Sequence, residues 1–325
     1  MLEWSLDRTV LRTYRHGCFH RQLPPKEREM TQSFARTEIS SQPGLWHRSA
    51  ALAGSLQDLL PADGARLAVV GCGTSWFMGQ SYAALRETGG RGRTDAFTPS
   101  EMPLSRSYDH VLAISRSGTT TEVLRLLDEL RGGVPTTVIT ATPDAVAGRA
   151  DTVVDLSGAD ERSVVQTRFA TTALALLRAH LGEDLGKAVA DAERVLAEPL
   201  PRHLLEAEQF TFLGTGWTVG LAHEAALKFR EAARFWTESY PALEYRHGPI
   251  SIAEPGRVTW MFGTAPHGLA DDVAATGGIF AEHAVDPMAD LVRAQRVAIE
   301  LAERRGLDPD HPRSLTRSVL LEEHA

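Results

Sequence analysis

Short apolar runs alternate with stretches of helical hydrophobic spacing along most of the chain. The first run, Leu67–Val70, ends in Gly71-Cys72-Gly73, and helical spacing then continues over residues 77–85. The same order recurs downstream, with apolar runs at 110–114, 136–140 and 152–156 and a helical pattern at 122–130. An apolar run of this length between turn residues is typical of a buried strand. The alternation predicts an α/β protein in which helices flank parallel sheets on both faces.

Helical spacing also extends on both sides of this region. A periodic stretch over residues 46–59 follows Gln42-Pro43, and proline is favoured in the first turn of a helix. A long helical pattern over residues 171–197 ends at Pro199-Leu200-Pro201. We place a domain boundary at these prolines, which gives a first lobe at residues 30–198 and a second lobe at 199–325.

The second lobe begins as a shorter repetition of the first. Residues 209–217 reproduce the apolar strand and the Gly-x-Gly turn, and helical spacing follows through Phe229. Its further strand candidates are 258–262 and 278–281, before a closing helix at 286–305. The sequence therefore predicts two tandem, doubly wound lobes, the second of which is short of a strand.

Composition and charge exclude several classes of protein. Hydrophobic residues make up 43% of the 325 positions and charged residues 23%, which is typical of a globular chain. With 34 basic and 42 acidic residues the net charge is −8, so no global positive field attracts nucleic acid or anionic lipid. No apolar run reaches about 18 residues, and two cysteines are too few for a disulfide framework. We expect a cytoplasmic protein without nucleic-acid or membrane partners.

Residues 1–29 are predicted to be an irregular leader. They mix charges without a clear period, and Met30 follows just before the first helical pattern. We expect translation to begin at Met30. Cys18 lies between His16 and His20, but three ligands this close together match no common zinc spacing, so no metal site is predicted.

The turn after the first predicted strand resembles a dinucleotide-binding turn only in part. The third glycine of that motif would fall at Trp76, where a large side chain prevents close packing of helix and strand. A turn that binds a smaller ligand through the amides and hydroxyls of Thr74 and Ser75 is the better interpretation.

Residues 115–122 carry the strongest local signal for a ligand. The segment Ser115-Arg116-Ser117-Gly118-Thr119-Thr120-Thr121 places five hydroxyl side chains between a buried strand and a helix. Backbone N–H groups and the positive end of the helix add to these donors, which favours a phosphate. The lysine of a nucleotide-binding loop is missing, so a phosphomonoester suits the segment better than ATP. The alternative is a hydroxyl cap of the helix, but a cap needs only one hydroxyl.

A second group of candidates lies on one helix of the second lobe. Glu224, Lys228 and Glu231 are spaced i, i+4 and i+7, which places them on one face. On spacing alone a routine surface ion pair is favoured, although a carboxylate beside an ammonium can also move a proton. His247, in the loop that follows, can exchange a proton near neutral pH, which suits the opening of a sugar ring. The arginines near the C-terminus either close over an anionic ligand or belong to a solvated tail.

Six motifs, in the same order, resemble those of the sugar isomerase (SIS) family. The similarity is greatest to its double-lobed amino-sugar phosphate enzymes, namely the isomerase domain of glucosamine-6-phosphate synthase and the related deaminase/isomerases, and it spans residues 34–320. The opening Gln42-Pro43-Gly44-Leu45-Trp46 is most similar to the galactosamine/tagatose-6-phosphate branch. The motifs are Glu38-Ile39 with Gln42-Pro43, Gly71–Ser75, Ser115-x-Ser117-Gly118-x-Thr120, the Glu224, Lys228 and Glu231 face, Arg246-His247-Gly248-Pro249, and Asp310-x-Pro312-Arg313.

The resemblance implies a role for each group of residues. Glu231 would move the proton between C1 and C2, with Lys228 and Glu224 orienting the substrate oxygens and tuning Glu231. His247 would assist ring opening, in the family often from the partner subunit of a homodimer. The sugar phosphate would be held by Ser115, Ser117 and Thr120 with Thr74 and Ser75, and further candidates at this site are Cys72, Gly73, Arg116 and Arg317.

Two departures from the family pattern narrow the implied reaction. Position 2 is Leu rather than the cysteine of a glutaminase domain, so glutamine is not expected to supply nitrogen. Arg317 stands where the synthase has a lysine, and a guanidinium cannot form an imine. We expect a deaminase/isomerase that converts a 2-amino-2-deoxyhexose 6-phosphate to ketose phosphate and ammonia, without metal or cofactor. A phosphosugar-binding sensor without turnover and an isomerase of another phosphosugar are the alternatives.

Overall fold

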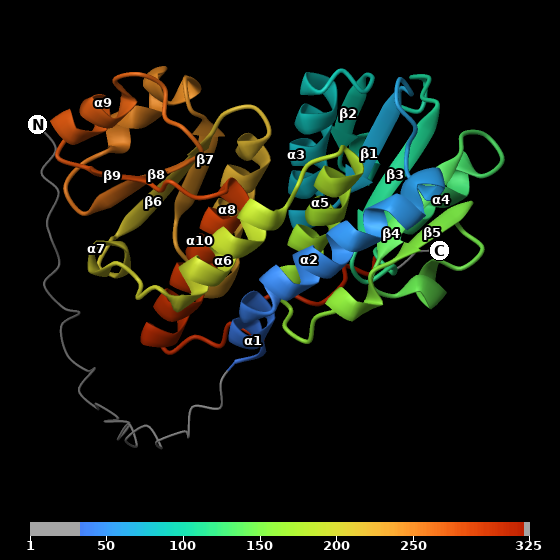
Figure 1. Ribbon diagram of the computed structural model, residues 1–325. Helices are drawn as coiled ribbons and strands as arrows, with labels where there is room; N and C mark the ends of the chain where they lie inside the picture. Colours follow the sequence, from blue (N-terminus) through green and yellow to red (C-terminus); the bar gives the residue numbers. More distant parts are fainter. Residues whose placement is uncertain (1–32, 322–325) are drawn as a thin grey trace, which may run out of the picture. The chain divides into compact units, whose positions relative to one another are not determined.

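Two parallel sheets organise the computed structural model, which describes residues 33–321 (Figure 1). The first sheet has five strands in the order β2-β1-β3-β4-β5, and the second has four in the order β7-β6-β8-β9. This confirms the predicted α/β architecture of two tandem lobes, with one strand fewer in the second. The predicted leader, the start at Met30 and the cluster around Cys18 lie outside the described residues. Within residues 33–321, no helix is both long and apolar enough to cross a membrane.

Strands and helices alternate along the chain as the apolar runs predict. The strands are β1 (Leu67–Gly71), β2 (Thr94–Phe97), β3 (His110–Ser115), β4 (Thr136–Thr140), β5 (Thr152–Asp155), β6 (Gln209–Gly214), β7 (Thr237–Pro241), β8 (Arg257–Phe262) and β9 (Ile279–Glu282). The helices are α1 (Phe34–Ser40), α2 (Gln42–Leu52), α3 (Thr74–Thr88), α4 (Thr121–Leu130), α5 (Arg168–His180), α6 (Gly186–Ala197), α7 (Arg202–Leu205), α8 (Thr218–Ala233), α9 (Leu269–Ala275) and α10 (Pro287–Arg304).

The sequence analysis missed β2 and β7, one in each sheet. Both are edge strands that pair with a single neighbour, β1 and β6 respectively. Their side chains are mostly half-buried or exposed, so neither strand needs the continuous apolar run that marks a strand buried on both faces.

The long helix expected over residues 171–197 is wrong. The chain forms α5 and α6 instead, because Gly182 adopts a φ of +89° between them and a right-handed helix cannot continue through that conformation. Likewise, the helix that begins at Gln42-Pro43 ends at Leu52, and residues 53–59 continue as a tighter 3₁₀ helix.

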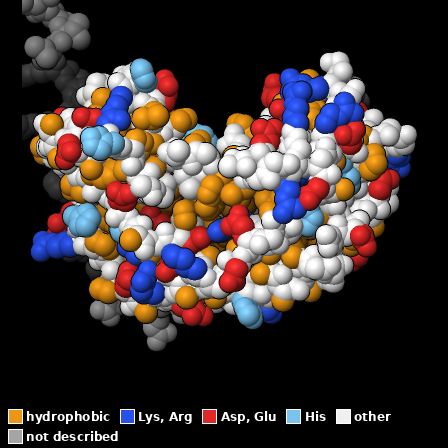
Figure 2. Space-filling model, turned by 45° about the horizontal axis from the view of Figure 1, so that its top comes forward, with side chains coloured by type: hydrophobic (Ala, Val, Ile, Leu, Met, Phe, Trp, Pro, Cys, Tyr) orange, Lys and Arg blue, Asp and Glu red, His pale blue; other side chains and the backbone are white. Residues whose placement is uncertain are grey.

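One apolar core joins the two sheets. Leu67 and Val69 of β1 belong to the same cluster of buried side chains as Phe210 and Phe212 of β6. Helices α2, α3, α5, α8 and α10 contribute to this cluster, and α3, α5, α8 and α10 lie between the sheets (Figure 1). On the opposite face of the first sheet, the alternate β1 residues pack against α4. Figure 2 shows a hollow between the two lobes on one face of the molecule.

Helices α3 and α8 approach each other closely between the lobes. A Cβ atom at Gly220 of α8 would lie 2.3 Å from both the backbone oxygen of Phe77 and the Oγ of Ser81 on α3. Further along α8, Leu227 reaches the start of α3, where its Cδ2 lies 3.7 Å from the Cβ position of Gly73. The two helices are therefore antiparallel, and the second half of α8 lies beside the carboxyl end of β1.

We expect Gly220→Ala to destabilise the protein, because the added methyl group has no space between α8 and α3. Such overpacking costs about 1–3 kcal/mol of the free energy of unfolding. Urea denaturation would measure it. Gly54→Ala is the matched control, since no heavy atom lies within 4 Å of its Cβ position. Equal stability of the two variants would contradict the close contact.

Candidate functional site

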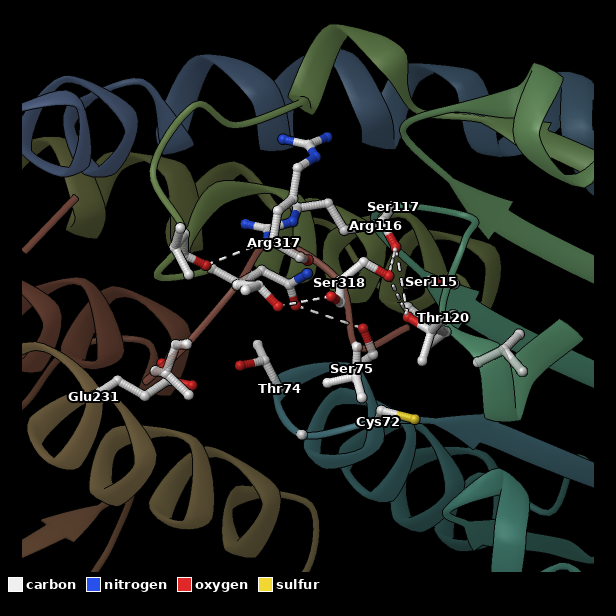
Figure 3. Close-up of a pocket in the computed structure, with 18 residues that line it drawn as sticks. Cys72, Thr74, Ser75, Ser115, Arg116, Ser117, Thr120, Glu231, Arg317 and Ser318 are labelled. Carbon is white, nitrogen blue, oxygen red and sulfur yellow. Dashed lines mark hydrogen bonds between the residues drawn. The ribbon is translucent and has the colours of Figure 1, made fainter. Parts of the chain in front are cut away.

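A cavity of about 200 Å³ lies at the carboxyl ends of β1 and β3 (Figure 3). These strands are neighbours, and the chain leaves β1 toward β2 on one side and returns to β3 on the other. In open α/β sheets this reversal of strand order creates the crevice in which ligands bind. The cavity is lined by residues 72–75 and 114–117, by Thr120, Val123, Val164 and Gln166, by Glu231 of α8, and by residues 315–319 of the C-terminal tail.

The turn between β1 and α3 is tight because of its glycines. A Cβ atom at Gly71 would lie 2.8 Å from the backbone of Ser75, and Gly73 has a φ of +52°. The turn therefore places Thr74 and Ser75 in the first turn of α3, where both are buried and line the cavity. Ser75 Oγ lies 3.5 Å from Gln166 Oε1, a residue that the sequence analysis did not select.

The turn between β3 and α4 brings hydroxyl groups together. Ser117 Oγ and Thr120 Oγ1 are 3.5 Å apart, and each contacts the Oγ of Ser318 in the tail, at 3.2 and 3.5 Å (Figure 3). Thr119 Oγ1 also donates to Ser318 Oγ, at 3.0 Å. Thr120 stands at the cap position of α4, but its side chain makes no capping hydrogen bond. The capping alternative is therefore wrong. We call the hydroxyls of the two turns the hydroxyl cradle; they belong to Thr74, Ser75, Ser115, Ser117, Thr119 and Thr120.

The C-terminal tail contacts the cradle through a few of its groups, although most of its side chains are exposed. The backbone N–H of Thr121 donates to Val319 O at 3.2 Å, so the tail uses a free amide at the start of α4. Arg317 forms an ion pair with Asp160 and donates to the backbone oxygen of Glu161. Its guanidinium points away from Glu231 (Figure 3). Arg313 is exposed and does not line the cavity.

Arg116 connects three segments of the cavity wall. Its buried guanidinium donates to the backbone oxygens of Ser163 at 3.1 Å, Val164 at 3.2 Å and Arg317 at 3.1 Å. It also lies 3.5 Å from the carboxylate of Glu161. Arg116 therefore holds the loop and the tail in place, rather than presenting a free cation to a phosphate.

Glu161 is a further organising residue that the sequence analysis missed. Its carboxylate accepts hydrogen bonds from the backbone N–H groups of Thr167 at 2.6 Å and Arg168 at 2.7 Å, at the start of α5. An acidic residue shortly before a helix is a recognisable signal for such binding. The predicted helix began at residue 171 rather than at Arg168, so the sequence analysis did not connect Glu161 with the start of α5.

The face of α8 is buried, which excludes the surface ion pair favoured on spacing alone. Glu224 and Lys228 are each 1% exposed. Lys228 Nζ lies 3.6 Å from Glu224 Oε1 and forms a shorter ion pair with Glu231. Of the three, only Glu231 lines the cavity. Lys228 thus stands between a fully buried carboxyl group and one that faces the hydroxyl cradle.

Burial changes the protonation of this face. It raises the pKa of Glu224 to about 8, although Lys228 beside it acts in the opposite direction. Burial alone would lower the pKa of Lys228, but Glu224 and Glu231 outweigh it and raise that pKa. At neutral pH Glu224 therefore retains its proton, and Lys228 stays charged and paired with Glu231.

Cys72 and His247, which the sequence analysis also selected, have surroundings that do not match a role in the cavity of this chain. Cys72 lines the cavity, but burial, with the nearby Glu122 carboxylate, raises the pKa of its thiol to about 11, so it is not a ready nucleophile. His247 is exposed in the loop after β7 and does not line the cavity. Among residues 33–321, no three His, Cys, Asp or Glu side chains form a group that could hold a metal.

Comparison with known proteins identifies the part of the chain that forms this cavity wall. Residues 61–181 match the SIS domain. The matched segment contains β1 to β5 and both hydroxyl-bearing turns of the cradle, so the part of the chain that is similar to a SIS domain supplies the cradle, while Glu231 comes from α8 beyond the matched residues.

Similarity extends beyond the SIS domain itself. The glutamine–fructose-6-phosphate aminotransferase (isomerizing) of Thermus thermophilus is 28% identical, over 88% of this chain and 58% of its own length. The chain thus spans little more than half of this relative. The glucosamine-6-phosphate deaminase structure from Thermotoga maritima aligns with a TM-score of 0.76 at 22% identity, covering 89% of this chain and all of that one. The tagatose-6-phosphate ketose/aldose isomerase from Escherichia coli gives 0.72 at 18% identity, covering 91% and 98%. These structures share the fold.

We expect Glu224→Gln to stabilise the protein at alkaline pH and to change little at acidic pH. The folded state raises the pKa of Glu224 from 4.5 to about 8. Between these two pH values the folded chain binds more protons than the unfolded chain, so the free energy of unfolding falls as the pH rises from 4.5 to about 8. Glutamine has no carboxyl group to ionise, so the variant does not lose stability in this way. Melting temperatures at about pH 5 and about pH 9 would measure the difference, with the exposed Glu193→Gln as control. A constant difference at both pH values would contradict a protonated Glu224.

Proposed function

We propose that this protein is an amino-sugar phosphate deaminase/isomerase. The observation that carries the proposal is that Glu231 and the hydroxyl cradle face the same cavity from two lobes. A phosphate held by the cradle and a base on the opposite wall would place the carbon chain of a small sugar between them. Such positioning removes much of the entropic barrier to a proton transfer.

The phosphate would bind through neutral donors. Ser115 ends β3, Ser117 and Thr120 lie in the turn that leads into α4, and Thr74 and Ser75 lie in the first turn of α3, so two helix N-termini face the cradle. Backbone N–H groups at helix N-termini favour an anion. The Ser318 hydroxyl, which now contacts the cradle, would donate to a phosphate oxygen or be displaced by it.

The reaction would need one base that serves two carbons. Glu231 would take the proton from C2 of the open aldose and return it to C1, while a second proton passes from the amino nitrogen to O1, which leaves an imine at C2 and a hydroxyl group at C1. Water would then add at C2 and ammonia would leave, so that the amino sugar phosphate and water give ketose phosphate and ammonia. Lys228 would keep Glu231 oriented. Because protonated Glu224 is neutral, it would not compensate the positive charge of Lys228, which would then act on Glu231 and on the substrate.

One feature favours this reaction over amide-nitrogen transfer. Arg317 is engaged by Asp160 and the Glu161 backbone, and its guanidinium cannot form an imine. We propose a reaction that is independent of glutamine and needs no metal or cofactor, in the cytoplasm.

Ring opening would require a second subunit. His247 lies outside the cavity of its own chain and is exposed, so it is available to the cavity of a partner. We propose a homodimer in which His247 of each chain assists ring opening in the other.

A phosphosugar sensor is the second candidate. The contact of Ser318 with three cradle hydroxyls favours it, because a tail that competes with the ligand could report ligand binding by its release. An isomerase of another phosphosugar would use the same cradle and base, without loss of ammonia.

Assays of ammonia and ketose release from glucosamine 6-phosphate and galactosamine 6-phosphate test the proposal. We expect release that requires the phosphate and that Glu231→Gln slows by about 10²–10⁴-fold, because the base is removed. Glu193→Gln, on the exposed side of α6, is the matched control and should keep full activity. Absence of release, with phosphosugar binding that survives Glu231→Gln, would instead support the sensor.

Mixing two inactive variants tests the shared site. If His247 acts across the dimer, Glu231→Gln and His247→Ala chains together form one intact site per mixed dimer. Random exchange in a symmetric dimer would then restore about a quarter of wild-type activity. If activity does not recover after confirmed subunit exchange, His247 does not act in the cavity of the partner subunit.

A further inference from the structure

A second cavity, of about 170 Å³, lies where α1, α6 and α10 meet, and we call it the helix-junction pocket. It shares no lining residue with the cavity at β1 and β3. Its wall combines two guanidinium groups, one hydroxyl and three aliphatic side chains. The lining residues are Arg36, Ile39, Ser40, Leu196, Arg296 and Ile299.

The carboxylates around this pocket are already paired with other arginines. Arg36 forms ion pairs with Glu300 at 2.7 Å and with Glu303. Glu300 is shared with Arg304, at 2.8 Å. The last nearby carboxylate, Glu198, accepts from Arg293 at 2.8 Å.

Arg296 is the exception among these arginines. It makes no ion pair within the described part of the chain, and its guanidinium donates to the backbone oxygen of Val195. Burial, with Arg293 and Arg36 nearby, lowers its pKa and outweighs Glu198 and Glu300, which act in the opposite direction. A half-buried guanidinium that forms no ion pair of its own favours an anion from solution.

We propose that the helix-junction pocket binds a small organic anion, a carboxylate with a short aliphatic chain. The carboxylate would pair with the fork of Arg296, beside Arg36 and the Ser40 hydroxyl. The aliphatic chain would lie against Ile39, Leu196 and Ile299, which inorganic anions cannot use. This site is independent of the proposed sugar chemistry, because its residues and its ligand are different.

Binding at this pocket would also strengthen the attachment of α1. This helix is held at its start by Asp310, which accepts from the N–H groups of Phe34 and Ala35 at 2.8 Å each. A ligand between Arg36 and Arg296 would add a link from α1 to α10, and a ligand that binds only the folded state raises the melting temperature.

Calorimetric titration of the full chain with butyrate tests the proposal, with 1-butanol as the uncharged probe and inorganic phosphate as the anion without a chain. We expect saturable butyrate binding at one site, a rise in melting temperature, and at least a roughly tenfold loss of affinity in Arg296→Gln, since a charge-assisted pair is removed. Arg202→Gln is the matched control, because this exposed arginine of α7 pairs with Glu206 and does not line the pocket. Ser40→Trp, which would fill the pocket from its exposed edge, is a second variant that should abolish binding.

Three results would overturn the proposal. The first is that butyrate shows no saturable binding, and the second is that butyrate and butanol bind with equal affinity. The third is that both Arg296→Gln and Ser40→Trp leave butyrate binding unchanged. Phosphate binding that Ser117→Ala removes would report on the hydroxyl cradle instead, so failure of this proposal is distinguishable from failure of the proposed enzyme.

Discussion

The antiparallel contact of α8 with α3 determines where the chemistry of this protein is placed. Gly220 has no side chain, so the two helices approach until the backbone of one meets the other. Leu227 then lies against Gly73, at the point where α3 leaves the first sheet. This register brings Glu231 of the second lobe to the crevice at β1 and β3. A Cβ atom at position 220 would lie 2.3 Å from the backbone oxygen of Phe77, so the contact between the two helices depends on this glycine.

Buried charge is the second constraint on the site. Lys228 and Glu224 are excluded from water, where an unpaired charge would be very costly. The protein meets this constraint by keeping a proton on Glu224, whose pKa is raised to about 8, and by pairing Lys228 with Glu231. The buried face then holds one ion pair and one neutral acid, and its only exposed end is the carboxylate that faces the cavity.

Neutral donors and distant segments form the rest of the cavity. The hydroxyls of Ser117 and Thr120 are close in sequence, yet the group that they contact, Ser318, comes from the end of the chain. Arg116 makes this arrangement possible, because its buried guanidinium binds both the loop at Val164 and the backbone of Arg317. The tail is thus part of the cavity wall, and a ligand that enters must share the cradle with it or displace it.

The sequence by itself determined the buried strands, the order of the two lobes and the hydroxyl-rich turns, because a strand buried on both faces must be apolar and a tight turn needs glycine. It also placed Glu224, Lys228 and Glu231 on one helical face. It could not reveal the edge strands β2 and β7, since half-exposed strands carry no continuous apolar run. Only the tertiary structure decided that this face is buried, that Arg317 turns to Asp160 and that His247 stands outside its own cavity. Burial and ion pairing depend on residues far apart in the chain, and no local pattern specifies which of them will meet.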